Sequence, residues 1–249
     1  MKNIVIAVHG FRTYGSWHAE LKSAIDRKAH SIFECPSTYQ FISYDYGFFG
    51  FPSFIYPPAK RTAVDAFKNS LLAYWDVENP PTIDIFAHSF GTYLVLHALA
   101  ATDLPDNFKV RNVVFASSAL PPNSFSKVFS RVKPRLRRLV NDCGTKDNAL
   151  LATLPVYGTG MAGRLGLHGP KGSQFCNRYF AVGHSGYFQY PAKDPNSHIS
   201  REWLPLLHDT SVVKLTDQRA SPPSLTDRVI SSLYEHGGQT AVIIYFGSL

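Results

Sequence analysis

The sequence has few cysteines, few charged residues and no long apolar run. Its three cysteines, Cys35, Cys143 and Cys176, are odd in number and widely spaced, which excludes a disulfide framework or a zinc cluster and predicts reduced thiols. Charged residues make up 17% of the chain and hydrophobic residues 45%, a balance that excludes a disordered protein. Every apolar run ends well before the roughly 20 residues that a membrane-spanning helix requires. The sequence therefore predicts a soluble globular protein.

The amino terminus lacks the apolar core of a secretion signal. The apolar stretch Ile4–Val8 follows the first three residues directly, and His9 and Gly10 interrupt it before a signal core could form. We therefore expect a cytoplasmic protein. The 249 residues suit a single domain with a large buried core, and no long linker, repeat or low-complexity tract divides them.

The chain carries a formal charge of +7, and residues 131–138 concentrate five of its positive groups. Such a stretch attracts phosphate groups or an anionic membrane surface, and it is also typical of a solvated edge that leads into a strand. Because no aromatic residues interleave with it and no nucleic-acid-binding module accompanies it, we expect no nucleic-acid partner. The basic stretch is compatible with peripheral contact with an anionic membrane.

Strand-like and helix-like segments alternate along most of the chain. Strands are predicted over residues 3–8, 40–44, 83–86, 110–116, 137–140 and 175–182. Helices are predicted over residues 17–27, 59–76, 92–100, 123–132 and 199–207. This alternation predicts the α/β class, with a mostly parallel sheet covered by helices on both faces. In such sheets, ligands bind at the carboxyl ends of the strands.

Residues 221–249 form an extension beyond a predicted core of residues 3–207. The extension starts with a predicted amphipathic helix that ends at Gly237 and Gly238. The apolar side of this helix consists of Leu225, Val229, Ile230 and Leu233. The wholly apolar run 240–246 then predicts a strand, which either extends the sheet at an edge or pairs with a second subunit in a homodimer.

The pentapeptide Ala87–Gly91 has Ser89 at its centre and small residues two positions away on each side. An apolar strand precedes it, and a buried helix follows it. A tight turn between strand and helix strains the backbone and brings the two elements close, which excludes bulky flanking side chains. The pattern therefore predicts a nucleophile turn that presents Ser89 at the end of a strand.

A serine hydroxyl becomes a nucleophile only with a base in reach and an acid that orients the base. Asp147 lies just beyond the glycine turn that follows the strand at 137–140, and Asp142 is the alternative acid. His184 lies between two glycines after the strand at 175–182 and is the predicted base. The competing histidines are His168, His198 and His208. The order Ser, Asp, His along the chain belongs to one particular triad architecture.

Acyl transfer also needs N–H donors for the developing oxyanion. After the first strand the chain turns sharply at Gly10, and the backbone N–H of Phe11 can then face the space above Ser89. The N–H of Phe90 supplies a second donor at the start of the helix, where the helix dipole adds partial positive charge.

Together these segments resemble the α/β-hydrolase superfamily, and specifically its compact bacterial serine esterase or lipase-like members. The matching segments are Val8–Phe11, Ala87–Gly91, Gly144–Asp147 and Gly183–Tyr187. The resemblance implies the nucleophile, base and acid roles for Ser89, His184 and Asp147, and the amide-donor roles for Phe11 and Phe90. The chain departs from the family pattern at Ala87, where glycine is commoner. It also begins at what is usually the third strand, so we expect a sheet that lacks the usual first strands.

The loop after the strand at 40–44 is rich in aromatic residues and should border the site. In it, Phe48 and Phe49 are candidate substrate-binding residues that would line an acyl pocket or form a lid, or would simply cover the core. Arg12 is a candidate for holding a substrate carboxylate or phosphate, and is equally typical of a surface arginine. Residues 158–163 match G-x-G-x-x-G but lack the strand, helix and acid that a dinucleotide site needs, which favours a flexible flap.

These features predict a serine hydrolase that cleaves the carboxylic ester of a small molecule or lipid through an acyl-enzyme. Water completes the reaction, so no metal or cofactor is expected. A thioesterase, an amidase or an acyltransferase would use the same residues. A catalytically silent hydrolase-fold module that binds a small ligand or a partner protein is the alternative from a different class.

Overall fold

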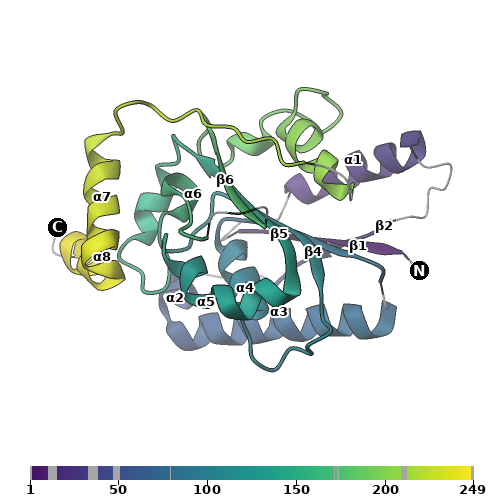
Figure 1. Ribbon diagram of the computed structural model, residues 1–249, viewed down its shortest axis with the longest axis horizontal. Helices are drawn as coiled ribbons and strands as arrows, with labels where there is room; N and C mark the ends of the chain where they lie inside the picture. Colours follow the sequence, from purple (N-terminus) through teal and green to yellow (C-terminus); the bar gives the residue numbers. More distant parts are fainter. Residues whose placement is uncertain are drawn as a thin grey trace.

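Six parallel strands form one sheet in the computed structural model, which describes residues 2–10, 16–32, 39–46, 51–78, 80–170, 172, 174–208 and 212–247. The strands are β1 (Asn3–Val8), β2 (Tyr39–Tyr44), β3 (Ile83–His88), β4 (Val110–Ala116), β5 (Leu136–Gly144) and β6 (Phe175–Phe180). Their spatial order is β2-β1-β3-β4-β5-β6, and every neighbouring pair is parallel. Helices cover both faces (Figure 1). The predicted fold class is confirmed.

The helices occupy the connections between the strands and the carboxyl-terminal end of the described chain. They are α1 (Ser16–Ile32), α2 (Phe51–Ile55), α3 (Pro57–Glu78), α4 (Phe90–Leu99), α5 (Ser124–Val132), α6 (Ala162–Leu165), α7 (Leu225–His236) and α8 (Gly238–Gly247). Shorter 3₁₀ turns cover Lys133–Arg135, Ala149–Thr153, Gly186–Phe188 and Leu204–Leu207, and a π-helical turn covers Ile199–Trp203. The six strands and four of the five helices expected in the core therefore exist, with ends shifted by a few residues, while the helix expected over residues 199–207 is a π-helical turn followed by a 3₁₀ turn.

Alternate residues of each strand point to opposite faces of the sheet. On one face Ile4, Ile6 and Val8 join the core beneath α3, α4 and α5, while on the other Val5 and Ala7 pack with α1 and the turns after β6. Burial on both faces explains why β1, β3 and β4 are largely apolar rather than alternating with polar residues. Because the strands are parallel, their carboxyl ends meet at one edge, where the chain places its candidate site.

Part of the basic stretch at residues 131–138 holds the fold together. Arg135 donates to the carbonyls of Leu99, Ala101 and Leu104, and so closes the carboxyl end of α4. Arg138 is also buried and donates to Asn112 Oδ1 at 2.8 Å. Two of the five positive groups in this stretch are therefore buried inside the fold instead of lying on a solvated surface.

The carboxyl-terminal extension is a helical hairpin, so the predicted strand over residues 240–246 is wrong. These residues lie in α8. They therefore neither extend the sheet at an edge nor offer a strand for pairing with a second subunit. Gly238 adopts a φ of 63°, a left-handed conformation that favours glycine. A side chain at Gly237 would place its Cβ 2.4 Å from the Cβ of Ala241. The glycine pair thus folds the apolar run back along α7.

Contacts with segments distant in the sequence explain why the run 240–246 is helical. Val242 packs in a small apolar cluster with Ile230 and Tyr234 of α7. The side chain of Gln239 accepts from the N–H of Gly158 at 3.1 Å and donates to two carbonyls of the same loop. A short, wholly apolar run fits a buried strand and a buried helix equally well. The tertiary contacts decide between them.

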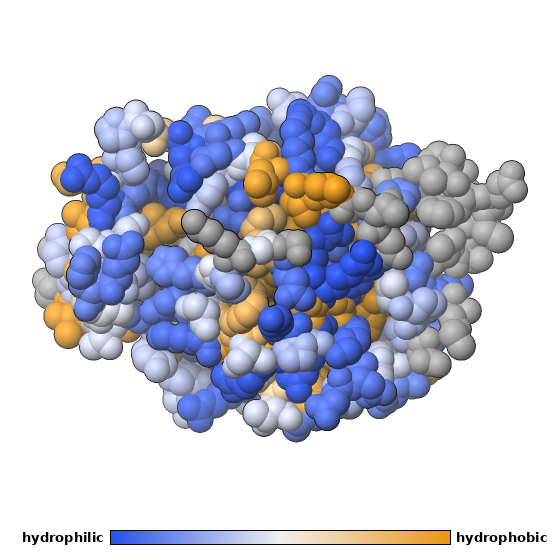
Figure 2. Space-filling view, in the orientation of Figure 1, coloured by the Kyte–Doolittle hydropathy of each residue, from blue (hydrophilic) through white to orange (hydrophobic). Residues whose placement is uncertain are grey.

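This end of the molecule also carries apolar surface. Figure 2 shows apolar groups interspersed with hydrophilic ones at the α7 and α8 end, and larger apolar areas near the middle of the same face. Ile244 of α8 is 67% exposed. None of the described helices is long and apolar enough to cross a membrane.

The glycine-rich segment at 158–163 is packed tightly against the loop that follows β4. A Cβ at Gly163 would lie 2.1 Å from the backbone nitrogen of Ser118, and one at Gly160 would lie 2.4 Å from the hydroxyl of Tyr234. Met161 between them is fully buried. The glycines therefore allow backbone to meet its neighbours, and the segment is a packed part of the fold instead of the flexible flap expected from the sequence.

Candidate active site

Ser89 occupies a strained turn between β3 and α4. Its φ of 54° and ψ of −124° lie outside the regions that residues other than glycine normally adopt. Its N–H donates to the carbonyl of Ala116 at 3.0 Å, and its carbonyl accepts from the hydroxyl of Thr92 at 2.7 Å. These bonds tie the turn to the end of β4 and to the first turn of α4. The strain is thus held by its surroundings, as at a nucleophile turn.

Two glycines allow the chain to approach Ser89 closely. A Cβ at Gly10 would lie 2.7 Å from the Cβ of Ser89, and a Cβ at Gly91 would lie 2.6 Å from the carbonyl oxygen of His9. The backbone after β1 therefore runs directly beside the serine. The N–H of Phe90 belongs to the first residue of α4, next to Ser89. Phe11, the other predicted oxyanion donor, lies outside the described residues.

His184 and Asp147 are in direct contact. The Nδ1 atom of His184 lies 2.9 Å from Oδ2 and 3.1 Å from Oδ1 of Asp147. Asp147 is fully buried, whereas the imidazole is 27% exposed. With Nδ1–H donating to the carboxylate, Nε2 stays available as a proton acceptor. This is the arrangement that a base and its orienting acid require.

The loop that carries Asp147 is fastened to the strand end that carries His184. The N–H groups of Thr145 and Lys146 donate to the carbonyls of Phe180 and Val182 at 2.9 and 3.0 Å. A Cβ at Gly144 would lie 2.8 Å from the carbonyl oxygen of Val182, so only glycine fits there. The glycine turn and the two backbone bonds therefore hold acid and base at one place.

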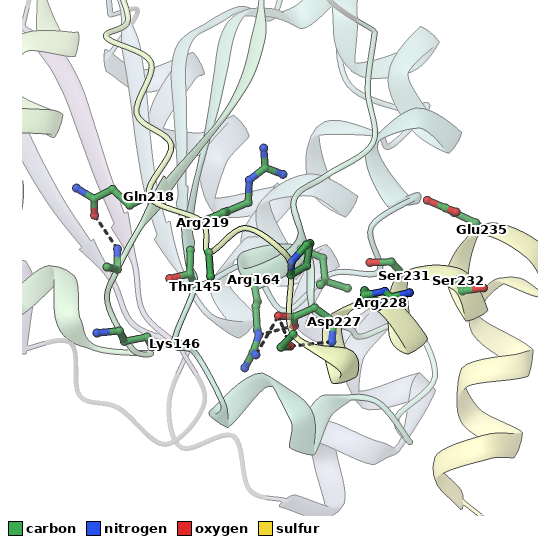
Figure 3. Close-up of a pocket in the computed structure, with 15 residues that line it drawn as sticks. Thr145, Lys146, Arg164, Gln218, Arg219, Asp227, Arg228, Ser231, Ser232 and Glu235 are labelled. Carbon is green, nitrogen blue, oxygen red and sulfur yellow. Dashed lines mark hydrogen bonds and ion pairs between the residues drawn. The ribbon is translucent and has the colours of Figure 1, made fainter.

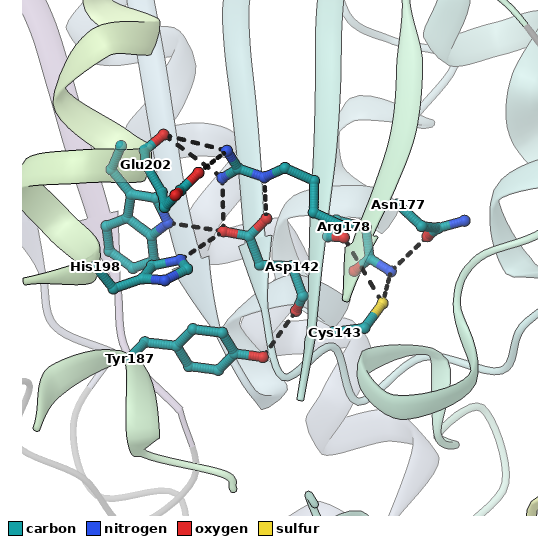
Figure 4. Close-up of polar contacts among 9 residues, drawn as sticks. Asp142, Cys143, Asn177, Arg178, Tyr187, His198 and Glu202 are labelled. Carbon is teal, nitrogen blue, oxygen red and sulfur yellow. Dashed lines mark hydrogen bonds and ion pairs between the residues drawn. The ribbon is translucent and has the colours of Figure 1, made fainter. Parts of the chain in front are cut away.

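Asp142, the alternative acid, lies in a different and closed environment (Figure 4). Its carboxylate accepts from Arg178 at 2.7 and 2.8 Å, from His198 Nε2 at 2.9 Å and from Trp203 Nε1 at 2.9 Å. Burial opposes the charge, but Arg178 and the hydrogen bond from His198 hold the pKa of this carboxyl well below its usual range. Arg178 is paired with Glu202 as well.

The competing histidines are placed away from Asp147. His198 belongs to the Asp142 network, and His168 is exposed after α6. His208 follows the turn whose Leu207 carbonyl accepts from Tyr39 at the start of β2, which is the opposite end of the sheet. Of the histidines weighed as the base, His184 is the one in contact with Asp147. Three predicted substrate-binding residues, Arg12, Phe48 and Phe49, lie outside the described residues.

Two residues near the site were not among the predicted site residues. His88 lies with its Nε2 2.9 Å from the carbonyl oxygen of His184. Ser117, after β4, donates its hydroxyl to the same carbonyl at 3.0 Å. The sequence offers a signal for His88, which is a polar residue beside the predicted nucleophile. It offers none for Ser117, because a positive φ of 49° at a serine has no sequence pattern.

The wall beside Gly10 is aromatic and polar. The ring of His9 stacks on Tyr46 with centroids 4.3 Å apart, and the Tyr46 hydroxyl donates to the His9 carbonyl at 3.1 Å. The imidazole of His9 also lies 3.4 Å from the carboxylate of Asp45. Tyr46, from the predicted aromatic loop, therefore does border the strand end next to Ser89.

A separate trough of about 670 Å³ lies where α7 meets the ends of β5 and β6 (Figure 3). Lys146 and Arg164 line one side of it, and Arg228 and Ser231 of α7 line the other. Neither Ser89 nor His184 lines it. Its helical wall is the hydrophilic face of α7, whose apolar residues Ile230 and Tyr234 are turned inward. The trough is thus a solvated junction beside the acid loop, separate from the serine.

In the described parts of the chain, no group of three or more His, Cys, Asp or Glu side chains is arranged to hold a metal ion.

Comparison with known proteins gives the same fold. Residues 1–183 match the family described as alpha/beta hydrolase of unknown function, DUF900, and no curated protein matches the chain. The lin2722 gene product of Listeria innocua is 13% identical, covers 87% of this chain and 99% of its own, and gives a TM-score of 0.51. At this identity the likeness shows the fold alone.

Two further solved structures are less similar in shape. A CIB-like hydrolase from Thermoplasma acidophilum is 14% identical over 77% of this chain and 81% of its own, with a TM-score of 0.47. An esterase from Pyrococcus furiosus is 12% identical over 76% of each chain, with a TM-score of 0.45.

The family match extends over 183 of the 249 residues. It includes the turn at Ser89 and the loop at Asp147, and it ends one residue before His184. The parallel sheet and the strained serine turn agree with it. The chain belongs to the family of alpha/beta hydrolases of unknown function.

Proposed function

We propose that the protein is a serine hydrolase that cleaves a carboxylic ester through an acyl-enzyme. The hydroxyl of Ser89 attacks the ester carbonyl carbon while Nε2 of His184 takes its proton. The tetrahedral intermediate then expels the alcohol, which receives that proton from His184. Water, deprotonated by His184, attacks the acyl-enzyme and releases the acid and free Ser89. Asp147 orients the imidazole and stabilises its charged form, and the Phe90 amide is a donor to the oxyanion.

The observation that carries this proposal is the contact of His184 with Asp147 at the strand edge that also presents the strained Ser89. The carboxylate is buried and the imidazole is partly exposed, so a substrate can reach the ring while the acid stays shielded. A histidine held only for structure would have no need of an accessible ring. Geometry of this kind is the criterion by which triads on unrelated sequences are recognised.

Reaction with a fluorophosphonate probe tests the class of function. We expect the wild-type protein to be labelled at Ser89, and Ser89→Ala to abolish labelling without unfolding the protein. Ser126→Ala is the matched control, because Ser126 is an exposed serine of α5, and it should label like the wild type. A folded wild-type protein that does not react would favour the silent binding module.

A panel of acyl substrates tests the type of bond. We expect p-nitrophenyl esters to be hydrolysed faster than the matched anilides, because an alcohol leaves more readily than an amine. Thioesters and transfer to added alcohols measure the thioesterase and acyltransferase alternatives with the same enzyme. Mixed lipid tests whether the ester is that of a lipid. If the wild type and Ser89→Ala release fatty acid at the same rate, a lipid ester is not the substrate of this site.

A further inference from the structure

The main-chain carbonyl of His184 is held from two neighbouring strands. His88, the last residue of β3, donates from Nε2 at 2.9 Å, and Ser117, the first residue after β4, donates from its hydroxyl at 3.0 Å. His184 itself follows β6. The two donors therefore cross the edge of the sheet to reach one atom of the loop that carries the imidazole.

The tautomer of the His88 ring follows from its hydrogen bond to the His184 carbonyl. A carbonyl oxygen can only accept, so Nε2 carries the proton and Nδ1 is left as an acceptor. The Nδ1 atom is buried and has no hydrogen-bond partner among the described residues. Burial is the main cause that lowers the pKa of His88 to about 3, and the neighbouring imidazole of His184 acts in the same direction, so the His88 ring stays neutral. Burying an imidazole with one unsatisfied nitrogen costs free energy. The hydrogen bond from its other nitrogen to the His184 carbonyl suggests a role that accounts for this cost.

Ser117 shows a similar cost. Its φ of 49° is a left-handed conformation that a serine adopts only where the surroundings impose it. The N–H of Ser117 donates to the carbonyl of Asp142 at 3.2 Å, which fixes the backbone and leaves the hydroxyl aimed at His184. The residue that holds the strained backbone of Ser117 is thus Asp142, whose own carboxylate is tied to Arg178, His198 and Trp203.

We infer that His88 and Ser117 are positioning residues that clamp the His184 carbonyl and so fix the base relative to Ser89. This inference rests on the proposed serine hydrolase function. The clamp acts on the main chain, which leaves Nδ1 of His184 to Asp147 and Nε2 to the nucleophile. His88 is also the residue next to Ser89, so one side chain links nucleophile and base. A misplacement of about 1 Å costs on the order of a hundredfold in rate, which is the effect the clamp prevents.

Substitutions at both residues test the clamp, with rates normalised by active-site titration. His88→Phe keeps the bulk and removes the donor, and we expect kcat to fall roughly ten- to a hundredfold with KM within about twofold. Fluorophosphonate labelling should slow by the same factor. In His88→Gln the side-chain amide can donate from near the position of Nε2, and most of the rate should return. Ser117→Ala should lower kcat by a smaller factor.

The control is His97→Phe. His97 is a half-buried histidine of α4 whose ring lies against Tyr93, away from the His184 loop, and we expect unchanged kcat. The double variant of His88→Phe and Ser117→Ala should lose less than the product of the two single losses, because both donors hold one carbonyl.

The outcomes separate this inference from the function on which it rests. Suppose that the wild type is labelled by the probe and hydrolyses ester, and that the folded variants of His88 and Ser117 do so at the same rate per active site. The clamp is then refuted, while the proposed serine hydrolase function is not. A fall in melting temperature without a fall in kcat would also refute it, since a packing role alone predicts that pattern. If the folded wild type neither labels nor turns over ester, the function itself fails and the clamp with it.

Discussion

Two carboxylate and imidazole pairs lie close together in the chain and differ in their surroundings. Asp142 meets His198, and Asp147 meets His184, each at 2.9 Å. The Asp142 carboxylate also accepts from Arg178 and Trp203, whereas for Asp147 the described side-chain contacts are those with His184. The His198 side chain is 10% exposed and that of His184 is 27% exposed.

The comparison shows that contact between an aspartate and a histidine is not enough to make the histidine a catalytic base. A carboxylate that already accepts from a guanidinium and an indole has its charge balanced, and its histidine is one more donor in a closed network. A carboxylate with a single partner leaves that partner's second nitrogen for a substrate. The number of donors and the access to the ring therefore distinguish a structural pair from a candidate catalytic one.

Replacing the acid of the open pair should give the largest effect. Asp147→Asn allows the wrong imidazole tautomer to be held, and we expect kcat on p-nitrophenyl acetate to fall on the order of 10⁴-fold. The melting temperature should change little. Asp147→Glu, which keeps the charge, is the matched variant and should retain more activity. An Asp147→Asn protein that turns over at the wild-type rate would show that Asp147 is no part of the reaction.

Replacing the acid of the closed pair should act on stability instead. Asp142→Leu leaves Arg178 buried without its main partner, and we expect the free energy of unfolding to fall by about 3 to 5 kcal/mol, measured by urea titration. Exchanging Arg178 for Met and its second partner Glu202 for Gln in the same protein should recover part of the loss, because no buried charge is then left without a partner. A stable Asp142→Leu protein with abolished turnover would reverse the roles assigned to the two acids.

Three histidines in buried or half-buried positions differ from His184, whose ring is partly exposed. Burial lowers the pKa of His18 to about 3, of His88 to about 3 and of His97 to about 4. The unfolded chain takes up protons at these rings below about pH 6.5, while the folded chain does not. Their contribution to stability is therefore complete above that pH and is lost as the pH falls toward 4 and 3.

Urea unfolding between pH 7 and pH 5 measures this loss. The slope should approach about 1.4 kcal/mol per pH unit for each histidine. His97→Phe should make the slope shallower by the contribution of one histidine, and exposed His236→Phe should leave it unchanged. A stability that does not change between pH 7 and pH 5 would contradict the neutral state of these rings in the folded protein.

The smallest effect is expected at the hairpin, far from both pairs. Gln239→Ala removes the three bonds that hold α8 to the loop at 156–159, at a cost of about 1 to 3 kcal/mol in total. Hydrogen exchange in α8 should become faster, while kcat stays within twofold. Thr240→Ala, at an exposed neighbour, is the matched control. Slower exchange in α8 of Gln239→Ala than in the wild type would contradict the docking role of that side chain.

The sheet and its covering helices could be predicted because their patterns are local. Apolar runs of strand length such as Ile4–Val8 alternate with amphipathic or buried helices, and the parallel order follows from that alternation. The serine turn was equally visible, since small residues are required where Gly91 meets the backbone of β1. Contacts between segments distant in the sequence could not be predicted in this way. The clamp on the His184 carbonyl and the helical state of residues 240–246 are two examples.

By itself the sequence determined the six strands of the sheet, most helices, the turn at Ser89 and the short set of acids and histidines that includes the candidate base and its partner. Only the tertiary structure decided which acid meets which histidine. Asp142 and Asp147 are five positions apart, and nothing in their neighbouring residues states that Arg178 and Trp203 fill the space around one of them. Backbone periodicity is encoded over a few residues, whereas the number of donors around a buried charge depends on segments far apart in the chain.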